Sequence, residues 1–233
     1  MTADPHVDAN KRVAAEAAVS EIEAGMIVGL GTGSTAAFAI SALGRRVAAG
    51  LAVTAVATSH ATELAARAAG ITIVPFADID HVGLAIDGAD EIDPQFRAIK
   101  GGGGALLREK IVAASARRMI CIVDDSKSVA QLSRPLPIEV LPFARSYVSA
   151  MIAALGGDPR LRVDSTGTPI LSDQANILID CAFGPIANPS TLAAALDAIP
   201  GILGHGLFLD EVDTVLVGTA HGVERRERRT NVI

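Results

Sequence analysis

The chain has 233 residues, enough for one large domain or for a main domain with a smaller one. Half of the residues are hydrophobic, yet only 3% are aromatic and Trp is absent, so the core must consist of Ala, Val, Leu and Ile. Such a core suits helices layered on a parallel sheet. The formal net charge of −6, from 26 acidic and 20 basic residues, provides no long-range attraction to nucleic acids or anionic membranes. We expect neither as a partner.

Several features predict a cytoplasmic protein. Cys121 and Cys181 lie in strand-like apolar runs without a CxxC spacing, which indicates buried free thiols in a reducing compartment. The N-terminus has no apolar segment followed by a cleavage site, so we expect no signal peptide. Residues 24–44 are uncharged over a length that could span a bilayer. Glycines and hydroxyl residues in the middle of that stretch predict a strand, a turn and a helix instead.

In the first half of the chain, short β-branched runs alternate with Ala-rich segments of helical length. The strands are predicted at 26–31, 51–57, 71–74, 82–86 and 119–123, and the helices at 10–24, 34–49, 60–69 and 105–118. This alternation predicts right-handed βαβ units and a Rossmann-like parallel sheet with helices on both faces.

After Lys127 the chain is rich in prolines, and the elements follow the order strand, helix, strand, strand, helix, strand. Helices are predicted at 145–155 and 189–199, with a hairpin centred on Ser172 and Asp173. This order predicts a smaller ferredoxin-like α+β domain.

The end of the chain is predicted to rejoin the first domain. The run at 213–219 is strand-like and should return to the first sheet, while the charged tail at 223–229 should be a solvated end. We therefore expect a Rossmann-like catalytic domain over 1–132 and 207–233, and the ferredoxin-like domain over 133–206.

A glycine-rich segment, GLGTGSTA at 29–36, follows the first predicted strand and opens into a helix. Glycines let the backbone approach a ligand closely, and the free N–H groups of a helix N-terminus bind anions. The hydroxyls of Thr32, Ser34 and Thr35 add further donors. The segment therefore predicts an anion site.

This segment also fits the G-x-G-x-x-A variant of a dinucleotide fingerprint. A dinucleotide site requires an acid roughly 20 residues later, at the end of the second strand, and residues 47–62 contain none. Thr58, Ser59 and Thr62 supply hydroxyls there, which suit a monophosphate or a sugar better than a ribose diol.

The acidic segment DGADEID at 87–93 also follows an apolar strand, at the sheet edge where open α/β folds bind ligands. Asp87 and Asp90 flank a Gly-Ala turn and could accept hydrogen bonds from sugar hydroxyls. Crowding of the two carboxylates could raise the pKa of one of them. The alternatives are a metal site, although the spacing fits no calcium loop, and an acidic surface turn.

The third segment, KGGGGALLREK at 100–110, contains four consecutive glycines, which are costly in a mere linker but suit a loop around a ligand. Lys100 could place a cation on an oxyanion or a phosphate. On the following helix, Glu109 is central to an apolar face, where burial should raise its pKa towards the range of a general base. The alternative is a buried structural ion pair with Lys100 or Lys127.

The segment DDSK at 124–127 lies at the end of the fifth strand and adds Lys127 as a second candidate cation. Lys11 and Arg12, in the first helix, are further candidates for a phosphate but could equally be solvated. The histidines are too scattered to predict a metal site.

Taken in order, the segments GTGST, DGADEI, KGGGGALxREK and DDSK closely resemble those of the ribose-5-phosphate isomerase family of the A type. The resemblance extends through the whole chain, including LGTGSTAAFAI and GLFLDEVDTVLVGT. One departure is TSHATE, where such proteins often carry a Ser-rich loop and this chain has His60.

The resemblance implies that the protein interconverts ribose 5-phosphate and ribulose 5-phosphate through an enediolate, without a metal or another cofactor, in the pentose phosphate pathway. Glu109 would move the proton between C2 and C1. Asp87, Asp90 and Lys100 would hold the sugar oxygens and assist ring opening, with Lys100 also stabilising the developing negative charge. The substrate contacts would be Thr32, Gly33, Ser34, Thr35, Asp87, Gly88, Ala89, Asp90, Lys100, Gly101, Gly102, Gly103 and Lys127. The family forms homodimers or homotetramers, so a homo-oligomer is expected.

Two other functions remain as alternatives. A sugar-phosphate sensor without catalysis could use the same fold, although the chain has no helix-turn-helix segment and no basic flank. A dinucleotide-dependent oxidoreductase is disfavoured by the missing acid after the second strand.

Overall fold

The structure, a computed structural model, describes residues 5–228. Within these residues the main sheet comprises the strands β1 (Ile27–Leu30), β2 (Thr54–Ala57), β3 (Thr72–Ile73), β4 (Leu84–Asp87), β7 (Met119–Asp124), β13 (Thr214–Thr219) and β14 (Gly222–Glu227). Their order across the sheet is β14-β13-β7-β4-β1-β2-β3, and all but β14 pair in parallel.

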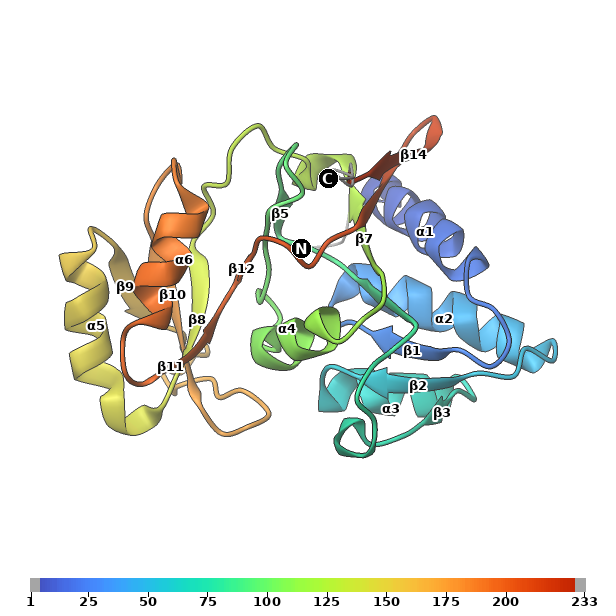
Figure 1. Cartoon of the computed structure of the whole chain (residues 1–233), viewed down its shortest axis with the longest axis horizontal. Helices are drawn as coiled ribbons and strands as arrows, with labels where there is room; N and C mark the ends of the chain where they lie inside the picture. Colours follow the sequence, from blue (N-terminus) through green and yellow to red (C-terminus); the bar gives the residue numbers. More distant parts are fainter. Residues whose placement is uncertain (1–4, 229–233) are drawn as a thin grey trace, which may run out of the picture.

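Helices cover both faces of this sheet, as the alternating pattern predicted (Figure 1). One face carries α1 (Pro5–Ser20), α2 (Ser34–Ala48) and α3 (His60–Ala68), whose buried alanines pack on the sheet with Val28, Leu30 and Ile86. The other face carries α4 (Leu106–Ala114) and a small antiparallel sheet of β5 (Glu91–Ile92), β6 (Ala98–Ile99) and β12 (Leu207–Phe208). Small side chains allow the helices to lie close to the strands, which explains a core almost without aromatics.

The smaller lobe is built from β8 (Leu136–Val140), α5 (Arg145–Ala154), β9 (Asp158–Leu161), β10 (Ile177–Ala182), α6 (Pro189–Asp197) and β11 (Ile202–His205). Its antiparallel sheet has the order β11-β8-β10-β9, and the two helices pack on a core of their own. The predicted ferredoxin-like α+β unit is therefore confirmed. Figure 1 shows this lobe beyond α4, away from the main sheet.

The strand order creates the place where a ligand can bind. From β1 the chain moves outward through β2 and β3 on one side, whereas β4, β7 and β13 lie on the other side. The loops that leave β1 and β4 therefore diverge, and a crevice opens between their carboxyl ends. Three short 3-10 turns complete the connections: η1 (Phe76–Asp78), η2 (Asp125–Lys127) and η3 (Pro142–Ala144).

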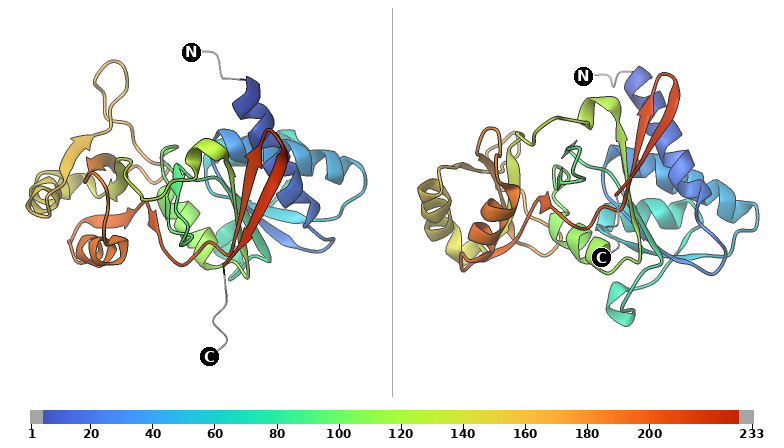
Figure 2. Two further views of the ribbon diagram at one scale, coloured as in Figure 1. Left: turned by 90° about the horizontal axis from the view of Figure 1, so that it is seen from above. Right: turned by 45° about the horizontal axis from the view of Figure 1, so that its top comes forward.

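The charged tail at 223–229 was predicted as a solvated end: its side chains up to 228 are mostly exposed, but it was wrong to expect no sheet there, and residue 229 lies outside the described residues. Residues 222–227 form β14, which pairs antiparallel with β13 and closes that edge of the sheet beside α1 (Figure 2). The backbone groups of β13 need partners, and an edge strand tolerates charged side chains on its exposed face. Arg225 contributes an ion pair with Glu21 at 2.5 Å, which ties β14 to the segment that follows α1.

Other boundaries differ by a few residues. Within the described residues α1 begins at Pro5 rather than at residue 10, because proline is well tolerated in the first helical turn. The expected turn at Ser172 and Asp173 is present, but the paired strand before it, β9, ends at Leu161, and an irregular stretch lies between them. Among residues 5–228, no helix has both the length and the apolar stretch needed to cross a membrane.

Candidate active site

The crevice at the carboxyl ends of β1 and β4 holds a cavity of about 320 Å³, within the usual size of a site for a small ligand. Its lining residues are Lys11, Thr32, Gly33, Ser34, Thr35, Gly88, Ala89, Asp90, Lys100, Gly101, Gly102, Gly103, Glu109 and Lys127. The structure thus brings together all the predicted site residues except Asp87, which lies behind the wall, and it includes Lys11, one of the two further candidates for a phosphate.

One end of the cavity is suited to an anion. The helix α2 begins at Ser34, and its N-cap, Gly33, provides no side-chain cap, so the first amides of the helix lack partners within it. The ammonium of Lys11, from α1, lies 3.2 Å from the hydroxyl of Ser34. Lys127, the last residue of η2, also lines the cavity. Backbone N–H groups, hydroxyls and two cations together form a phosphate-binding arrangement.

The hydroxyls of the TSHAT segment do not line this cavity. Thr58, Ser59 and Thr62 are buried, and all three lie within hydrogen-bond distance of the Thr32 hydroxyl, at 2.8, 2.9 and 3.2 Å. Thr62 also donates to the carbonyl of Gly31. These hydroxyls hold the glycine-rich loop from behind, so they shape the anion site instead of contacting its ligand.

The other end of the cavity contains a buried cation between two buried carboxylates. The Nζ atom of Lys100 lies 2.9 Å from Asp87 and 3.4 Å from Glu109, and it donates to the carbonyl of Gly88. Its ammonium lies over the ring of Phe208, whose centroid is 5.3 Å from Nζ. Phe208 belongs to the buried core behind the cavity and was not predicted as a partner of Lys100, because a single aromatic in an apolar run is typical of a core.

Burial controls the protonation of these groups. Burial raises the pKa of Glu109 to about 8; Lys100 opposes the shift and the charge of Asp87 adds to it. Burial also raises the pKa of Asp87, against the effect of Lys100 and two backbone N–H groups. For Lys100, burial alone would lower the pKa, but the two carboxylates raise it, so the side chain stays charged. The site therefore combines a permanent cation with a carboxylate that can exchange a proton near neutral pH.

Glu109 is the buried carboxylate of this group that lines the cavity. It lies on the buried side of α4, as the helical periodicity predicted, and Lys100 is its ion-pair partner. Its Oε2 atom makes no hydrogen bond although it is buried. This oxygen faces the ammonium of Lys100 at 3.4 Å, and no donor satisfies it by a hydrogen bond, which is uncommon for a buried carboxylate with a structural role alone.

Asp87 is fixed more completely than Asp90. Its Oδ1 atom accepts hydrogen bonds from the amides of Thr32 and Gly88, and its Oδ2 faces Lys100. A side chain at position 31 would place its Cβ 1.9 Å from Oδ1, which explains the glycine there. Asp87 thereby joins the β1 loop to the cation.

Asp90 lines the cavity directly and is oriented by the four-glycine loop. The amide of Gly102 donates to its Oδ2 atom at 2.9 Å. Gly101 and Gly104 have positive φ values of 102° and 80°, so the tight turn of this loop favours glycine at both positions. The loop is therefore a shaped wall of the site and not a linker.

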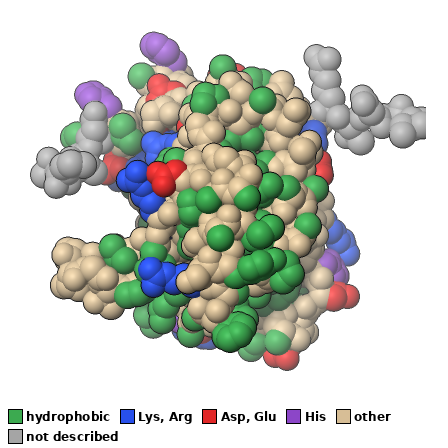
Figure 3. Space-filling model, turned by 90° about the vertical axis from the view of Figure 1, so that its left-hand side faces the viewer, with side chains coloured by type: hydrophobic (Ala, Val, Ile, Leu, Met, Phe, Trp, Pro, Cys, Tyr) green, Lys and Arg blue, Asp and Glu red, His purple; other side chains and the backbone are tan. Residues whose placement is uncertain are grey.

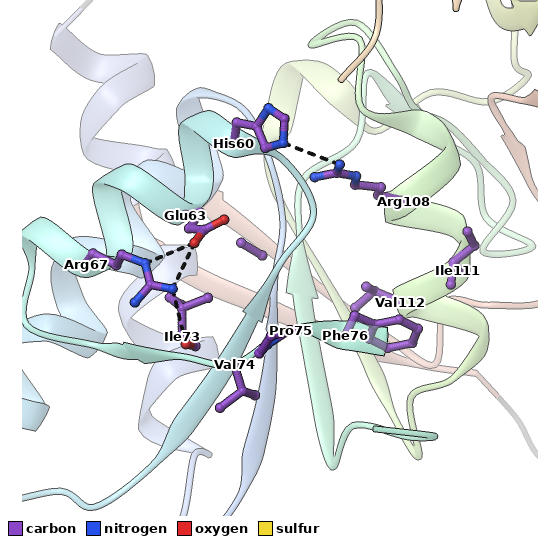
Figure 4. A pocket seen from close by; sticks show the side chains of 11 residues that line it. His60, Glu63, Arg67, Ile73, Val74, Pro75, Phe76, Arg108, Ile111 and Val112 are labelled. Atoms are coloured by element: carbon purple, nitrogen blue, oxygen red, sulfur yellow. Dashed lines mark hydrogen bonds and ion pairs between the residues drawn. The ribbon is translucent and has the colours of Figure 1, made fainter. Parts of the chain in front are cut away.

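His60 and Arg12 lie outside the substrate cavity. His60 borders a separate cavity of about 360 Å³ between α3, η1 and α4, where it faces Arg108 (Figure 4). Glu63 and Arg67 pair with each other in the same region. Arg12 packs over the ring of Phe38. Of the two adjacent candidates in the first helix, only Lys11 lines the site.

Among the residues that the structure describes, no group of three or more His, Cys, Asp or Glu side chains is arranged as metal ligands would be. The polar groups of the cavity are instead carboxylates, ammonium groups, hydroxyls and amides. This set can bind a phosphate at one end and move protons on a hydroxylated carbon chain at the other.

Comparison with known proteins identifies relatives with this arrangement. Residues 54–222 match the family model described as ribose 5-phosphate isomerase A (phosphoriboisomerase A). A protein of Sphingopyxis alaskensis named ribose-5-phosphate isomerase A is 53% identical over 221 residues, which are 94% of this chain and 96% of that protein. The protein of the same name from Thermomicrobium roseum is 48% identical over 95% of each chain.

Solved structures show the same fold. A D-ribose-5-phosphate isomerase in complex with phospho-erythronic acid superposes with a TM-score of 0.92 at 37% identity, covering 95% of this chain and 99% of that one. Ribose 5-phosphate isomerase A of Methanocaldococcus jannaschii superposes with a TM-score of 0.89, also at 37% identity, covering 94% of this chain and 98% of that one.

Proposed function

This chain belongs to the ribose 5-phosphate isomerase A family and interconverts ribose 5-phosphate and ribulose 5-phosphate, and we propose that Glu109 is the base that moves the proton between C2 and C1. The observation that carries this assignment is that Glu109 lines the cavity and that its Oε2 atom, which accepts no hydrogen bond, lies 3.4 Å from the ammonium of Lys100. The reaction belongs to the non-oxidative branch of the pentose phosphate pathway.

The reaction needs a base and an adjacent cation. On the open-chain aldose, Glu109 removes the proton from C2, and the electron pair of that bond forms the C1–C2 double bond of the enediolate. Negative charge then develops on the oxygen of C1, and the ammonium of Lys100 stabilises it in a site sheltered from water. Glu109 returns the proton to C1 while the proton of the C2 hydroxyl passes to the oxygen of C1, so that C2 becomes the carbonyl and C1 carries the hydroxyl of the ketose.

The resemblance implies that Asp87 and Asp90 both hold the sugar oxygens and assist ring opening, and we propose that Asp90 does so while Asp87 supports the site from behind the wall. Asp90 can reach the sugar directly, since it lines the cavity. Asp87 also holds the ammonium of Lys100 in place. The phosphate binds at the opposite end, to the amides and hydroxyls of the loop 32–35 and to Lys11 and Lys127.

Neither alternative function has support. The curated relatives from Sphingopyxis alaskensis and Thermomicrobium roseum are named as isomerases, and they match over nearly the full length of the chain, so a sensor without catalysis is not indicated. A dinucleotide would need an acid at the end of β2, where Thr58 and Ser59 instead hydrogen-bond to Thr32.

We propose that the protein is a homo-oligomer in which α5 meets a second copy. The turn η3 and α5 expose apolar side chains at intervals of four residues: Phe143, Tyr147, Met151 and Leu155. Hydrophobic side chains gather on this side of the molecule (Figure 3). Arg145 is the only charged residue from 141 to 157, so two copies can meet here through the same face without strong repulsion between like charges.

Free buried cysteines fit the expected cytoplasmic location.

The base can be tested by solvent exchange. Ribose 5-phosphate in D₂O with a chelator should yield ketose carrying solvent deuterium with the wild-type protein. Glu109→Gln should reduce turnover by roughly 10²–10⁴-fold with little change in substrate binding, because a positioned base is lost. Glu16→Gln, at an exposed position, is the control and should be fully active. Unchanged turnover in Glu109→Gln would exclude Glu109 as the base.

A further inference from the structure

Arg162, just beyond β9 in the smaller lobe, contacts the loop that lines the substrate cavity. We propose that it is a positioning residue for the isomerase, which holds the four-glycine loop so that the loop in turn orients Asp90. This inference rests on the proposed function, because it assigns a purpose to the geometry of that site. It connects the ferredoxin-like unit to the reaction.

The guanidinium of Arg162 reaches the backbone of the loop directly. Its Nη1 atom donates to the carbonyls of Gly101 and Gly102, at 3.1 and 3.2 Å. Its Nε and Nη2 atoms donate to the two carboxylate oxygens of Asp180, at 2.8 and 2.5 Å. A bidentate pair of this kind fixes the plane of a guanidinium, so Asp180 aims Nη1 at the loop.

Arg162 is itself well anchored. Its amide donates to the carbonyl of Leu178 at 2.8 Å, and its carbonyl accepts from the amide of Ile170. Asp180 lies in β10, which pairs with a strand on each side. The two side chains therefore extend from the rigid sheet of the smaller lobe.

The loop needs such an external anchor. Its four glycines, 101–104, have no side chains to pack, and its own turn is closed by one hydrogen bond from the amide of Gly104 to the carbonyl of Gly101. The amide of Gly102 is the group that donates to Asp90. Without the bonds from Arg162, the peptides on both sides of Gly102 could rotate and this amide would leave Asp90.

Arg162 acts through the loop and not on the substrate. It is absent from the lining of the cavity. Of its five N–H hydrogens, two are directed to Asp180 and up to two more to the glycine carbonyls, so it has little capacity left for a ligand. A role in positioning fits this geometry, whereas direct phosphate binding does not.

Arg160, two residues earlier in β9, provides a matched control. Its Nε and Nη2 atoms both donate to Oδ2 of Asp158, at 3.0 and 2.8 Å. The side chain of Arg160 is 79% exposed, compared with 15% for Arg162, and it pairs with Asp158 rather than with the glycine loop. Replacing either arginine by alanine removes one ion pair from this part of the smaller lobe. Only the replacement of Arg162 also removes a contact with the glycine loop.

The experiment compares Arg162→Ala with Arg160→Ala in two measurements. Hydrogen exchange of the amides in 100–105 should be at least about tenfold faster in Arg162→Ala and unchanged in Arg160→Ala, because only the first variant frees the loop. In the isomerase assay, Arg162→Ala should lose roughly tenfold to hundredfold in kcat/KM. Equal exchange rates in the two variants would overturn the proposal without any reference to activity.

Two further variants separate positioning from simple support. Arg162→Lys keeps the charge but cannot form the fork and reach both carbonyls, so it should remain close to Arg162→Ala. In an Asp90→Ala background, Arg162→Ala should cause little additional loss, because both changes affect the same step. Wild-type activity in Arg162→Lys would contradict this role. So would an equal fractional loss of kcat/KM from Arg162→Ala in the wild-type and the Asp90→Ala backgrounds. Turnover of the wild-type protein in the same assay shows whether the proposed function holds independently.

Discussion

At the residue scale, Lys100 and Glu109 lie side by side in a buried site, and each alters the protonation of the other. Asp87 shares the same ammonium, so three charged groups occupy a space that water barely enters. Such groups are costly to bury unless they are paired or used. Glu109 is the member of this trio of carboxylates and ammonium that lines the cavity with an oxygen not satisfied by a hydrogen bond.

The raised pKa of Glu109 should appear in the pH dependence of the reaction. Burial raises this pKa to about 8, and a base must be ionised to accept a proton. The value of kcat/KM should therefore rise with pH up to about 8 and fall roughly tenfold per unit below it. A profile over pH 5 to 10 measures this limb, and a limb near the ordinary glutamate value of 4.5 would contradict the assigned environment.

The same shift predicts an effect on stability. Because the pKa of Glu109 is higher in the folded state than its unfolded value of 4.5, folding favours the protonated carboxyl. The resulting stabilisation is fully present below pH 4.5 and is lost as the pH rises to about 8. Glu109→Gln removes this dependence. The melting temperature of the variant, minus that of the wild type, should therefore increase from pH 5 to pH 9. The exposed control Glu16→Gln should show no such trend, and a constant difference for Glu109→Gln would contradict the prediction.

At the scale of elements, the site depends on loops that leave strands and enter helices with almost no space for side chains. The β1 loop approaches Asp87 so closely that position 31 admits only glycine. The four-glycine loop is constrained in the same way, because a Cβ on Gly102 would lie 2.7 Å from Asp90. These loops hold the carboxylates by backbone contact.

Gly31→Ala should therefore disturb the active site from within. Its Cβ would overlap the carboxylate of Asp87, which must then move away from Thr32 and Lys100. Overpacking of this kind costs about 1–3 kcal/mol of unfolding free energy, and turnover should fall with it. Gly83→Ala is the control, because its Cβ would meet neighbours only at ordinary contact distances. Urea unfolding measures the stability of the two variants, and the isomerase assay measures their turnover. Equal stability and equal turnover in Gly31→Ala and Gly83→Ala would contradict the close contact at position 31.

At the scale of the whole molecule, two units with separate cores meet at α4. The boundaries at 133 and 206 remain a prediction, since Leu132 and Leu207 pack with the core of the smaller unit. The smaller unit contributes Arg162 to the site and carries the apolar face of α5.

The face of α5 predicts the assembly state. Phe143 is 96% exposed, and Phe143→Asp would place a charge of the same sign from each copy in the proposed contact. Light scattering after size exclusion should then show a smaller assembly than for the wild type. Leu64→Asp is the control, because Leu64 on α3 is 70% exposed but lies elsewhere. An unchanged mass for Phe143→Asp would place the contact on another face.

The sequence by itself determined the properties that depend on neighbours along the chain. Strand and helix periods predicted both sheets, since those patterns are local, and the glycine and acidic segments predicted the loops of the site. The helical period also identified Glu109 as buried on α4 before any contact was known.

Only the tertiary structure decided relations between residues far apart in sequence. It placed Asp87 behind the wall and Asp90 on it, turned the hydroxyls of Thr58 and Ser59 towards Thr32, and paired β14 with β13. It also brought Arg162 to Gly101 from 61 residues away. These outcomes follow from the packing of complete elements, in which each polar group takes the partner that the fold brings near, and no local pattern records that choice.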